Sequence, residues 1–366
     1  MVEVLTTKAL SRATLARQML LKREKTTALR AVERLAGLQA QLARPPFIGL
    51  WSRLERFRAE DLTRPVHARK IVRATLMRGT LHLVTTKDYR ALRPLFQPML
   101  TASLQAILGA RARGLDLDRL TATARSCLDE RPQTFEELRS ALRAAWPQAD
   151  ERAMGYAVRM HLPLIQVPAE TRWGWPGAAA FAAAETWLGA RVDTQGQGDL
   201  RALVLRYLAA FGPASVRDAE TWSYVRGLAD TFEALRPRLR VFRDERGREL
   251  FDLPKAPRPP ADTPAPVRFL PDYDNVLLAH ADRTRVIADA HRSKVATANL
   301  RTLATFLVDG FVTGVWRIER KRASASLLLE SFAPVSRKTR AELAEEGEAL
   351  VRFVEPDART ADVRFG

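Results

Sequence analysis

Two glutamines, Gln39 and Gln41, are placed so that their side chains could act together. Ala28, Val32 and Leu35 repeat at helical spacing, and Gln39 continues this apolar stripe at a position where a core residue is expected. A pair of carboxamides can accept and donate hydrogen bonds without carrying charge. The pair is therefore a candidate for a site that holds and orients polar groups.

The backbone around these glutamines is expected to be extended. Gly37 weakens the helix at this point, and Pro45 and Pro46 prevent its continuation. In extended backbone, alternate side chains share a face, so Gln39 and Gln41 would project side by side. The alternative is that they satisfy backbone groups of a loop, as polar side chains at helix ends often do. Both interpretations stay open on these residues alone.

Positive charge is concentrated in the part of the chain that contains this pair. The net charge is +17, and residues 1–120 hold 23 basic and 9 acidic side chains. Such clustering is typical of proteins that bind polyanions, above all nucleic acids, although membranes and acidic proteins also attract basic surfaces. The candidate DNA contacts in this segment are Arg69, Lys70, Arg73, Arg78, Thr80 and His82. The alternatives are a solvated basic face and, for His82, a packed histidine.

Other classes of site find little support in the composition. Cys127 is the only cysteine, and the five histidines lack the spacing of zinc ligands, so we expect neither a metal nor another cofactor. No apolar run is long enough for a membrane span, and the first 30 residues do not form a secretory signal. We expect a cytoplasmic monomer that does not bind membranes.

Three stretches share an order of helices followed by a pair of strands, which is typical of a winged helix-turn-helix. The first has helical patterns at 15–20, 28–35 and 67–78 and a strand at 80–84. The second has a capping box at Thr134 and Glu137, a helix at 150–160 and strands at 162–167 and 172–175. The third has a helix at 200–211, a capping pair at Ser215 and Asp218, and strands at 239–242 and 249–253.

A proline-rich segment separates these stretches from a different composition. Residues 254–266 contain six prolines and should form a stiff, extended connector. Strand patterns at 303–308, 311–318 and 326–332 and a helix at 338–353 follow. The sequence thus predicts an α+β protein with three tandem winged helix-turn-helix motifs and a C-terminal small β-barrel. The expected units are 1–120, 121–198, 199–253, the linker 254–266, and 267–366.

Several segments resemble the AlkZ-type winged-helix DNA glycosylases, over nearly the whole chain. They are LQAQ at 38–41, FIGLWSRL at 47–54, LMRGTLHLV at 76–84, FLPDYDNVLL at 269–278 and VDGFVTGVW at 308–316. The resemblance implies three winged helices and a C-terminal barrel, and it implies that a Gln-x-Gln motif, here Gln39 and Gln41, is catalytic. A related branch of the family has Gln-x-Asp instead.

The implied activity is removal of alkylated purines from duplex DNA without a cofactor. Alkylation at N7 or N3 makes the purine a good leaving group, so a neutral amide that orients water and faces the developing charge is sufficient. We assign Gln41 to the water and Gln39 to the lesion or sugar, although these roles could be exchanged. No lysine lies near the motif in the sequence, so we expect a monofunctional enzyme.

Two other functions use the same charge and fold. One is a transcription regulator and the other is a damage-recognition protein without catalysis. The adduct, the processing of interstrand crosslinks, and the choice between general repair and self-resistance to DNA-alkylating metabolites stay open.

Overall fold

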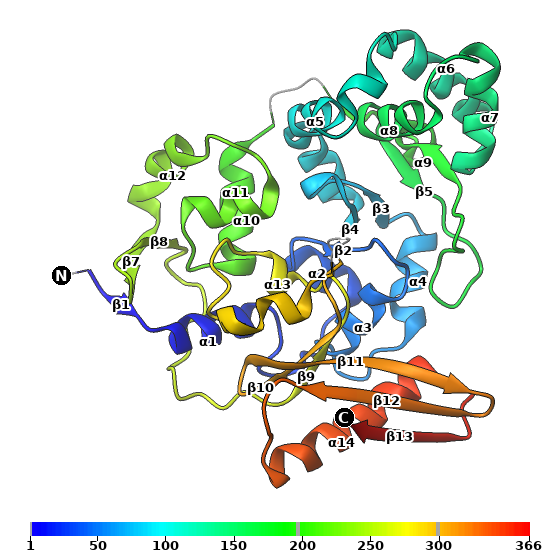
Figure 1. The fold of residues 1–366 in the computed structure, drawn as a ribbon. Coiled ribbons are helices and arrows are strands. Elements are labelled where there is room, and N and C mark those ends of the chain that lie inside the picture. The colour runs from blue at the N-terminus through cyan, green and yellow to red at the C-terminus, as the bar shows by residue number, and fades with distance from the viewer. Residues whose placement is uncertain (1, 195–197, 298–300) are drawn as a thin grey trace.

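The computed structural model describes residues 2–194, 198–297 and 301–366. The described chain forms three sheets with their helices, and the short strand that carries Gln39 is the edge strand of one of them, near the middle of the molecule (Figure 1). A lobe of helices α5 to α9 lies on one side of this strand, helices α10 to α12 lie on another, and the C-terminal sheet lies below. No helix in the described ranges is both long and apolar enough to cross a membrane.

The first part of the chain builds the sheet that contains the glutamines. The edge strand β2 pairs with β4, and β4 pairs with β3, both antiparallel. Arg78 (φ 57°) and Gly79 (φ 67°) are both left-handed, which gives the tight turn between β3 and β4. The elements are β1 (Val4–Leu5), α1 (Thr7–Arg17), α2 (Ala28–Arg34), β2 (Leu38–Gln39), α3 (Pro45–Trp51), α4 (Ala59–His67), β3 (Ile71–Thr75) and β4 (Leu81–Thr85).

The helix expected at 67–78 is wrong. The helix there is α4, which ends at His67, and β3 follows it. All five residues of β3 are buried, because the strand is central in its sheet and helices α4 and α5 pack against it, so the strand lacks the alternation of a half-exposed strand. Gly79, directly after the expected helix, lies in the hairpin turn between β3 and β4. The first helix is also displaced, because α1 ends at Arg17 rather than near residue 20.

The second part of the chain extends the same sheet, whose strand order is β2-β4-β3-β5-β6. The capping box of Thr134 and Glu137 is confirmed, as is the helix near 150–160. The strand expected at 172–175 is wrong, because Phe181–Ala183 pairs with β5 while the buried Trp175 donates to the Gln166 carbonyl. The elements are α5 (Thr86–Leu108), α6 (Leu117–Glu130), α7 (Phe135–Ala145), α8 (Glu151–His161), β5 (Leu164–Gln166), β6 (Phe181–Ala183) and α9 (Ala184–Leu188).

The third part matches the sequence pattern closely. Ser215 and Asp218 form a capping box, and the two predicted wing strands pair as an antiparallel hairpin. Strand β1 adds to this hairpin in parallel. The elements are α10 (Leu200–Phe211), α11 (Val216–Ser223), α12 (Ala229–Leu235), β7 (Arg240–Asp244) and β8 (Glu249–Asp252). Three tandem winged helices with the expected bounds stay an interpretation of this order, and residues 195–197 of the second unit lie outside the described residues.

The C-terminal part is an open sheet, so the expected barrel is wrong. The described strand order is β13-β12-β11-β10-β9, with no pairing between the outer strands β13 and β9. Strand β13 lies parallel to β12, and α14, which connects them, packs on the sheet and covers its apolar residues. The elements are β9 (Arg268–Leu270), α13 (Asn275–Leu278), β10 (Thr305–Val308), β11 (Phe311–Lys321), β12 (Ser324–Ser331), α14 (Arg337–Val354) and β13 (Thr360–Phe365).

Candidate active site

Gln39 is held by an arginine rather than by a loop. It is paired across the sheet with His82, and its side chain is 7% exposed. The Arg78 guanidinium donates to Gln39 Oε1 at 2.7 Å. Because a guanidinium can only donate, the oxygen of the amide must face it, and the amide nitrogen must point the other way.

Gln41 is oriented in the same sense by the backbone. The Leu81 N–H donates to Gln41 Oε1 at 2.7 Å, so this oxygen also faces the sheet. Gln41 itself lies in a bend just after β2 and is partly exposed. Within the described residues, neither amide nitrogen of the pair has a protein partner, and each oxygen retains a second lone pair. The two amides can therefore still bind a ligand or water.

Arg73 braces the backbone between the two glutamines. It projects from β3, is 5% exposed, and donates to the Ala40 carbonyl at 2.8 Å and to the Gln41 carbonyl at 3.1 Å. Its guanidinium carbon lies 5.3 Å from the Trp175 ring centre. Burial lowers the pKa of Arg73 to about 10, which still leaves the side chain charged at neutral pH. Arg73, predicted to contact DNA, thus positions the motif in this structure.

The partly buried Arg78 and the buried His82 form a pair beside Gln39. His82 is 1% exposed, its Nδ1 lies 3.0 Å from the Thr80 carbonyl, and its Nε2 lies 3.3 Å from the Arg78 guanidinium. Nδ1 must therefore carry the hydrogen, and Nε2 accepts from Arg78. Burial, followed by the charge of Arg78, lowers the pKa of His82 to about 3, so the imidazole is neutral. Burial also lowers the pKa of Arg78 to about 10.

The remaining predicted DNA contacts differ in exposure. Arg69 and Lys70 are exposed in the turn before β3, where Arg69 stacks on Trp187 with its guanidinium carbon 4.2 Å from the ring centre. Thr80 is partly buried and donates to the Met77 carbonyl. The structure therefore brings Arg73, Arg78 and His82 to the glutamines, whereas Arg69 and Lys70 stay predicted surface contacts.

A segment far along the chain also positions the motif, and its role was missed in the sequence. Asn275 donates to the carbonyls of Leu35 (3.2 Å) and Gly37 (2.7 Å), immediately before β2. Asp274 forms a buried two-point ion pair with Arg53, with distances of 2.8 and 2.9 Å. The signal was the polar triplet Asp272, Asp274 and Asn275 inside the otherwise apolar run 269–278.

The site thus consists of two neutral amides with fixed oxygens, the buried guanidinium of Arg73, the partly buried guanidinium of Arg78 and a neutral imidazole. Among the described residues, no group of three histidine, cysteine or acidic side chains lies close enough together to bind a metal. The arrangement can accept and donate hydrogen bonds in a basic environment. An arrangement of this kind can orient a polar or negatively charged ligand.

Comparison with known proteins identifies the family. Residues 32–353 match the model of the family described as DNA glycosylase AlkZ-like. The chain belongs to the AlkZ-like DNA glycosylases. This match covers both glutamines and their hydrogen-bond donors Arg73, Arg78 and Leu81. Membership of this family makes the protein an enzyme of the DNA glycosylase class.

Two further comparisons agree with this assignment. The chain is 26% identical over 329 residues to the interstrand DNA cross-link repair glycosylase of Streptomyces sahachiroi, covering 82% of this chain and 85% of that protein. The solved structure of the Streptomyces sahachiroi DNA glycosylase AlkZ superposes with a TM-score of 0.78 at 22% identity, covering 99% of this chain and 100% of that one. The AlkZ-like member described here therefore shares the α+β fold of that structure.

Proposed function

We propose that the protein hydrolyses the N-glycosidic bond of N7- or N3-alkylated purines in duplex DNA, with water as the nucleophile. The observation that carries this proposal is the pair Gln39 and Gln41, whose amides are oriented by fixed donors within a basic part of the chain. An alkylated purine is cationic and departs readily. The enzyme then needs only to stabilise the developing oxocarbenium sugar and to place water at C1′.

The hydrogen bonds support different roles for the two glutamines. Gln41 Oε1 receives a hydrogen bond from a neutral backbone N–H, so its second lone pair can still accept from the attacking water. Gln39 Oε1 is bound by the positive Arg78, which draws electron density from that oxygen. Gln39 is thus better suited to donate, through its amide nitrogen, to the lesion or the sugar. We assign water positioning to Gln41 and lesion orientation to Gln39.

The proposed product is a free base and an intact strand with an abasic site. None of the side chains that form hydrogen bonds with Gln39 or Gln41 in the described structure is a lysine, so no Schiff base with C1′ is proposed. The curated relative acts, by its name, on interstrand cross-links. We propose that the substrate class of this chain is alkylated duplex DNA, including DNA with cross-linked purines. We also propose that the protein acts as a cytoplasmic monomer.

A single-turnover excision assay tests the proposal. With a duplex that contains N7-methylguanine, Gln41→Ala should lower the rate of base release about 10²-fold or more, the scale of one lost positioned dipole. Gln148→Ala, which removes an exposed amide from the loop after α7, is the matched control and should leave the rate unchanged. Wild-type rates in the double variant Gln39→Ala/Gln41→Ala would contradict the assignment. Binding without any base release would favour a regulator or a damage-recognition protein.

A further inference from the structure

Residues 279–285, which follow α13, are fixed to the third part of the chain at most positions. The side chain of Arg283 differs from its neighbours, because it forms no hydrogen bond or ion pair with any other described residue, and its buried Nε has no partner. The contacts that hold the segment join the Ala279 carbonyl to Tyr207, His280 to the Phe211 carbonyl, the Ala281 N–H to Asp218, Asp282 to Arg246 and Arg248, and Arg285 to the Pro213 carbonyl.

The unpaired guanidinium of Arg283 has an energetic cost. The side chain is partly buried, and burial, followed by the charge of Arg292, lowers the pKa of Arg283. A cation withdrawn from water lowers the stability of the fold unless an anion or a hydrogen-bond acceptor compensates it. The backbone of Arg283 is held in place, whereas its guanidinium lacks an acceptor. This combination is expected of a side chain that is preorganised for an anionic ligand.

A second guanidinium without a counterion lies close to Arg283. Arg78 donates to the Trp222 carbonyl near the end of α11, and Asp218 near the start of this helix accepts from the Ala281 N–H. Burial lowers the pKa of Arg78, and the charge of Arg283 lowers it further. Within the described ranges, neither arginine has a carboxylate at ion-pair distance. Two neighbouring guanidiniums that share no counterion favour the binding of an anion.

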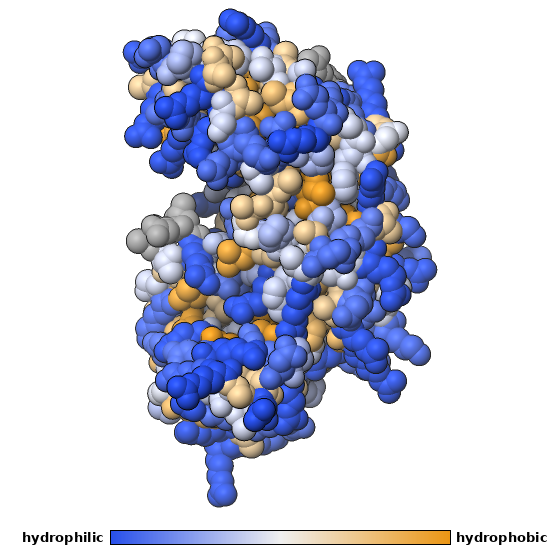
Figure 2. Space-filling model, turned by 90° about the vertical axis from the view of Figure 1, so that its right-hand side faces the viewer, coloured by the Kyte–Doolittle hydropathy of each residue, from blue (hydrophilic) through white to orange (hydrophobic). Residues whose placement is uncertain are grey.

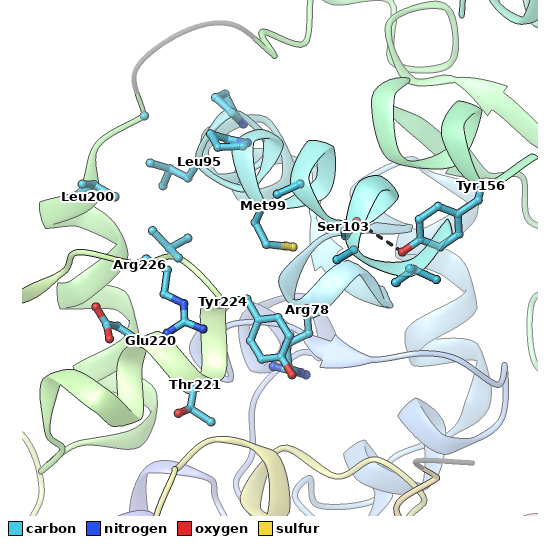
Figure 3. A pocket seen from close by; sticks show the side chains of 17 residues that line it. Arg78, Leu95, Met99, Ser103, Tyr156, Leu200, Glu220, Thr221, Tyr224 and Arg226 are labelled. Atoms are coloured by element: carbon cyan, nitrogen blue, oxygen red, sulfur yellow. Dashed lines mark hydrogen bonds between the residues drawn. The ribbon is translucent and has the colours of Figure 1, made fainter. Parts of the chain in front are cut away.

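The surroundings of these two guanidiniums are open to solution. Arg283 is partly exposed, and Arg78 lies at the wall of a hollow between α5 and the segment that follows α11, with the ring of Tyr224 beside it (Figure 3). Tyr224 is 52% exposed. The face of the molecule shown in Figure 2 is mainly hydrophilic, and its outline is indented between the helical lobe and the rest. An anionic group of a ligand can therefore reach the two side chains.

We propose that Arg283 and Arg78 together bind one phosphate of the DNA backbone next to the lesion nucleotide. A phosphodiester has two free oxygens that can accept from two guanidiniums, and it supplies the missing negative charge. Arg78 also donates to Gln39 Oε1, so the bound phosphate is fixed relative to the glutamine pair. This inference rests on the proposed function and adds to it the backbone group that places the lesion at the glutamines.

A neutral phosphate analogue tests the inference. The probe is a fluorescent duplex with one tetrahydrofuran abasic-site analogue, in which a methylphosphonate replaces the phosphate on the 5′ or the 3′ side of the analogue. For the wild-type protein, one of these replacements should raise the Kd, measured by fluorescence anisotropy, about tenfold or more, the scale of lost charge-assisted hydrogen bonds. For Arg283→Met, the same replacement should raise the Kd at most about threefold, because one charged partner of this phosphate is already absent.

A control variant and the stability of Arg283→Met separate phosphate binding from folding. Arg337→Met removes an exposed guanidinium at the start of α14 and should retain the full effect of the methylphosphonate. Arg283→Met should have an unchanged or higher melting temperature, because it removes a partly buried charge that has no partner.

Two results would overturn the inference. One is an Arg283→Met protein that retains the full effect of the methylphosphonate, and the other is a wild-type protein that is insensitive to both replacements. Absence of base release from N7-methylguanine DNA by the wild-type protein would instead refute the proposed function, and the binding measurement does not depend on that release.

Discussion

Replacement of Arg73 by methionine tests whether the motif depends on the geometry of its backbone. The variant removes two hydrogen bonds from a charged group to the carbonyls of Ala40 and Gln41, each worth roughly 1.5–3 kcal/mol. Burial lowers the pKa of Arg73 from 12.5 to about 10, which corresponds to a cost of about 3 kcal/mol for the buried charge. The free energy of unfolding should therefore fall by only about 0–3 kcal/mol.

The effect on catalysis should be larger than the effect on stability. Without Arg73, the bend after β2 can shift, and a displacement of about 1 Å at a reacting group can cost about 10² in rate. The excision rate at saturating enzyme should fall by roughly this factor, with little change in DNA affinity. Arg73→Lys restores one donor and should recover part of the rate. Arg337→Met removes an exposed guanidinium at the start of α14 and serves as the control.

Two results would refute this reasoning. An excision rate within twofold of wild type would show that the carbonyl contacts do not determine the motif geometry. A loss of DNA affinity in Arg73→Met, with an unchanged rate at saturation, would make Arg73 a phosphate contact, as the sequence predicts.

Three further predictions concern pH, stability and salt. Burial lowers the pKa of His82 from 6.5 to about 3, so the unfolded state binds the proton first as pH falls, and about 2 kcal/mol of stability should be lost between pH 8 and pH 5. Chemical unfolding of His82→Gln should show a pH dependence weaker by this amount, and an equal dependence would contradict the assignment. Asp274→Ala leaves Arg53 buried without its partner and should lower the free energy of unfolding, measured by chemical unfolding, by about 3–5 kcal/mol. A loss below about 1 kcal/mol would argue against the ion pair. Duplex affinity should fall with salt at a log–log slope of about −0.9 per phosphate contacted, and a flat response would contradict electrostatic binding.

The elements with a clear local signal could be predicted from the sequence. The capping boxes at Thr134 and Ser215 fix helix starts by contacts within three residues, and the structure contains both. The wing of the third part has a turn between two short apolar strands, and it is present. The extended backbone at Gln39 also follows from local breakers and is confirmed.

The errors occur where distant segments decide the structure. The sequence pattern of β3 resembles that of a helix because all five of its residues are buried, with helices α4 and α5 packed against this central strand. The expected barrel is an open sheet because α14 covers its apolar residues, which the strand pattern alone does not reveal. The contacts of Arg73 and Asn275 with the motif depend on the tertiary arrangement, so no pattern of residue spacing in the sequence predicts them.

The hydrogen bond from Asn275 to the Gly37 carbonyl joins residues 238 positions apart. During synthesis, the glutamine strand and its basic surroundings leave the ribosome long before this contact can form. An incomplete chain would thus contain the basic residues that bind DNA before Asn275 can fix the backbone next to the glutamines. Incomplete chains should then bind DNA without releasing bases, so activity is coupled to completion of the fold rather than to formation of its first part.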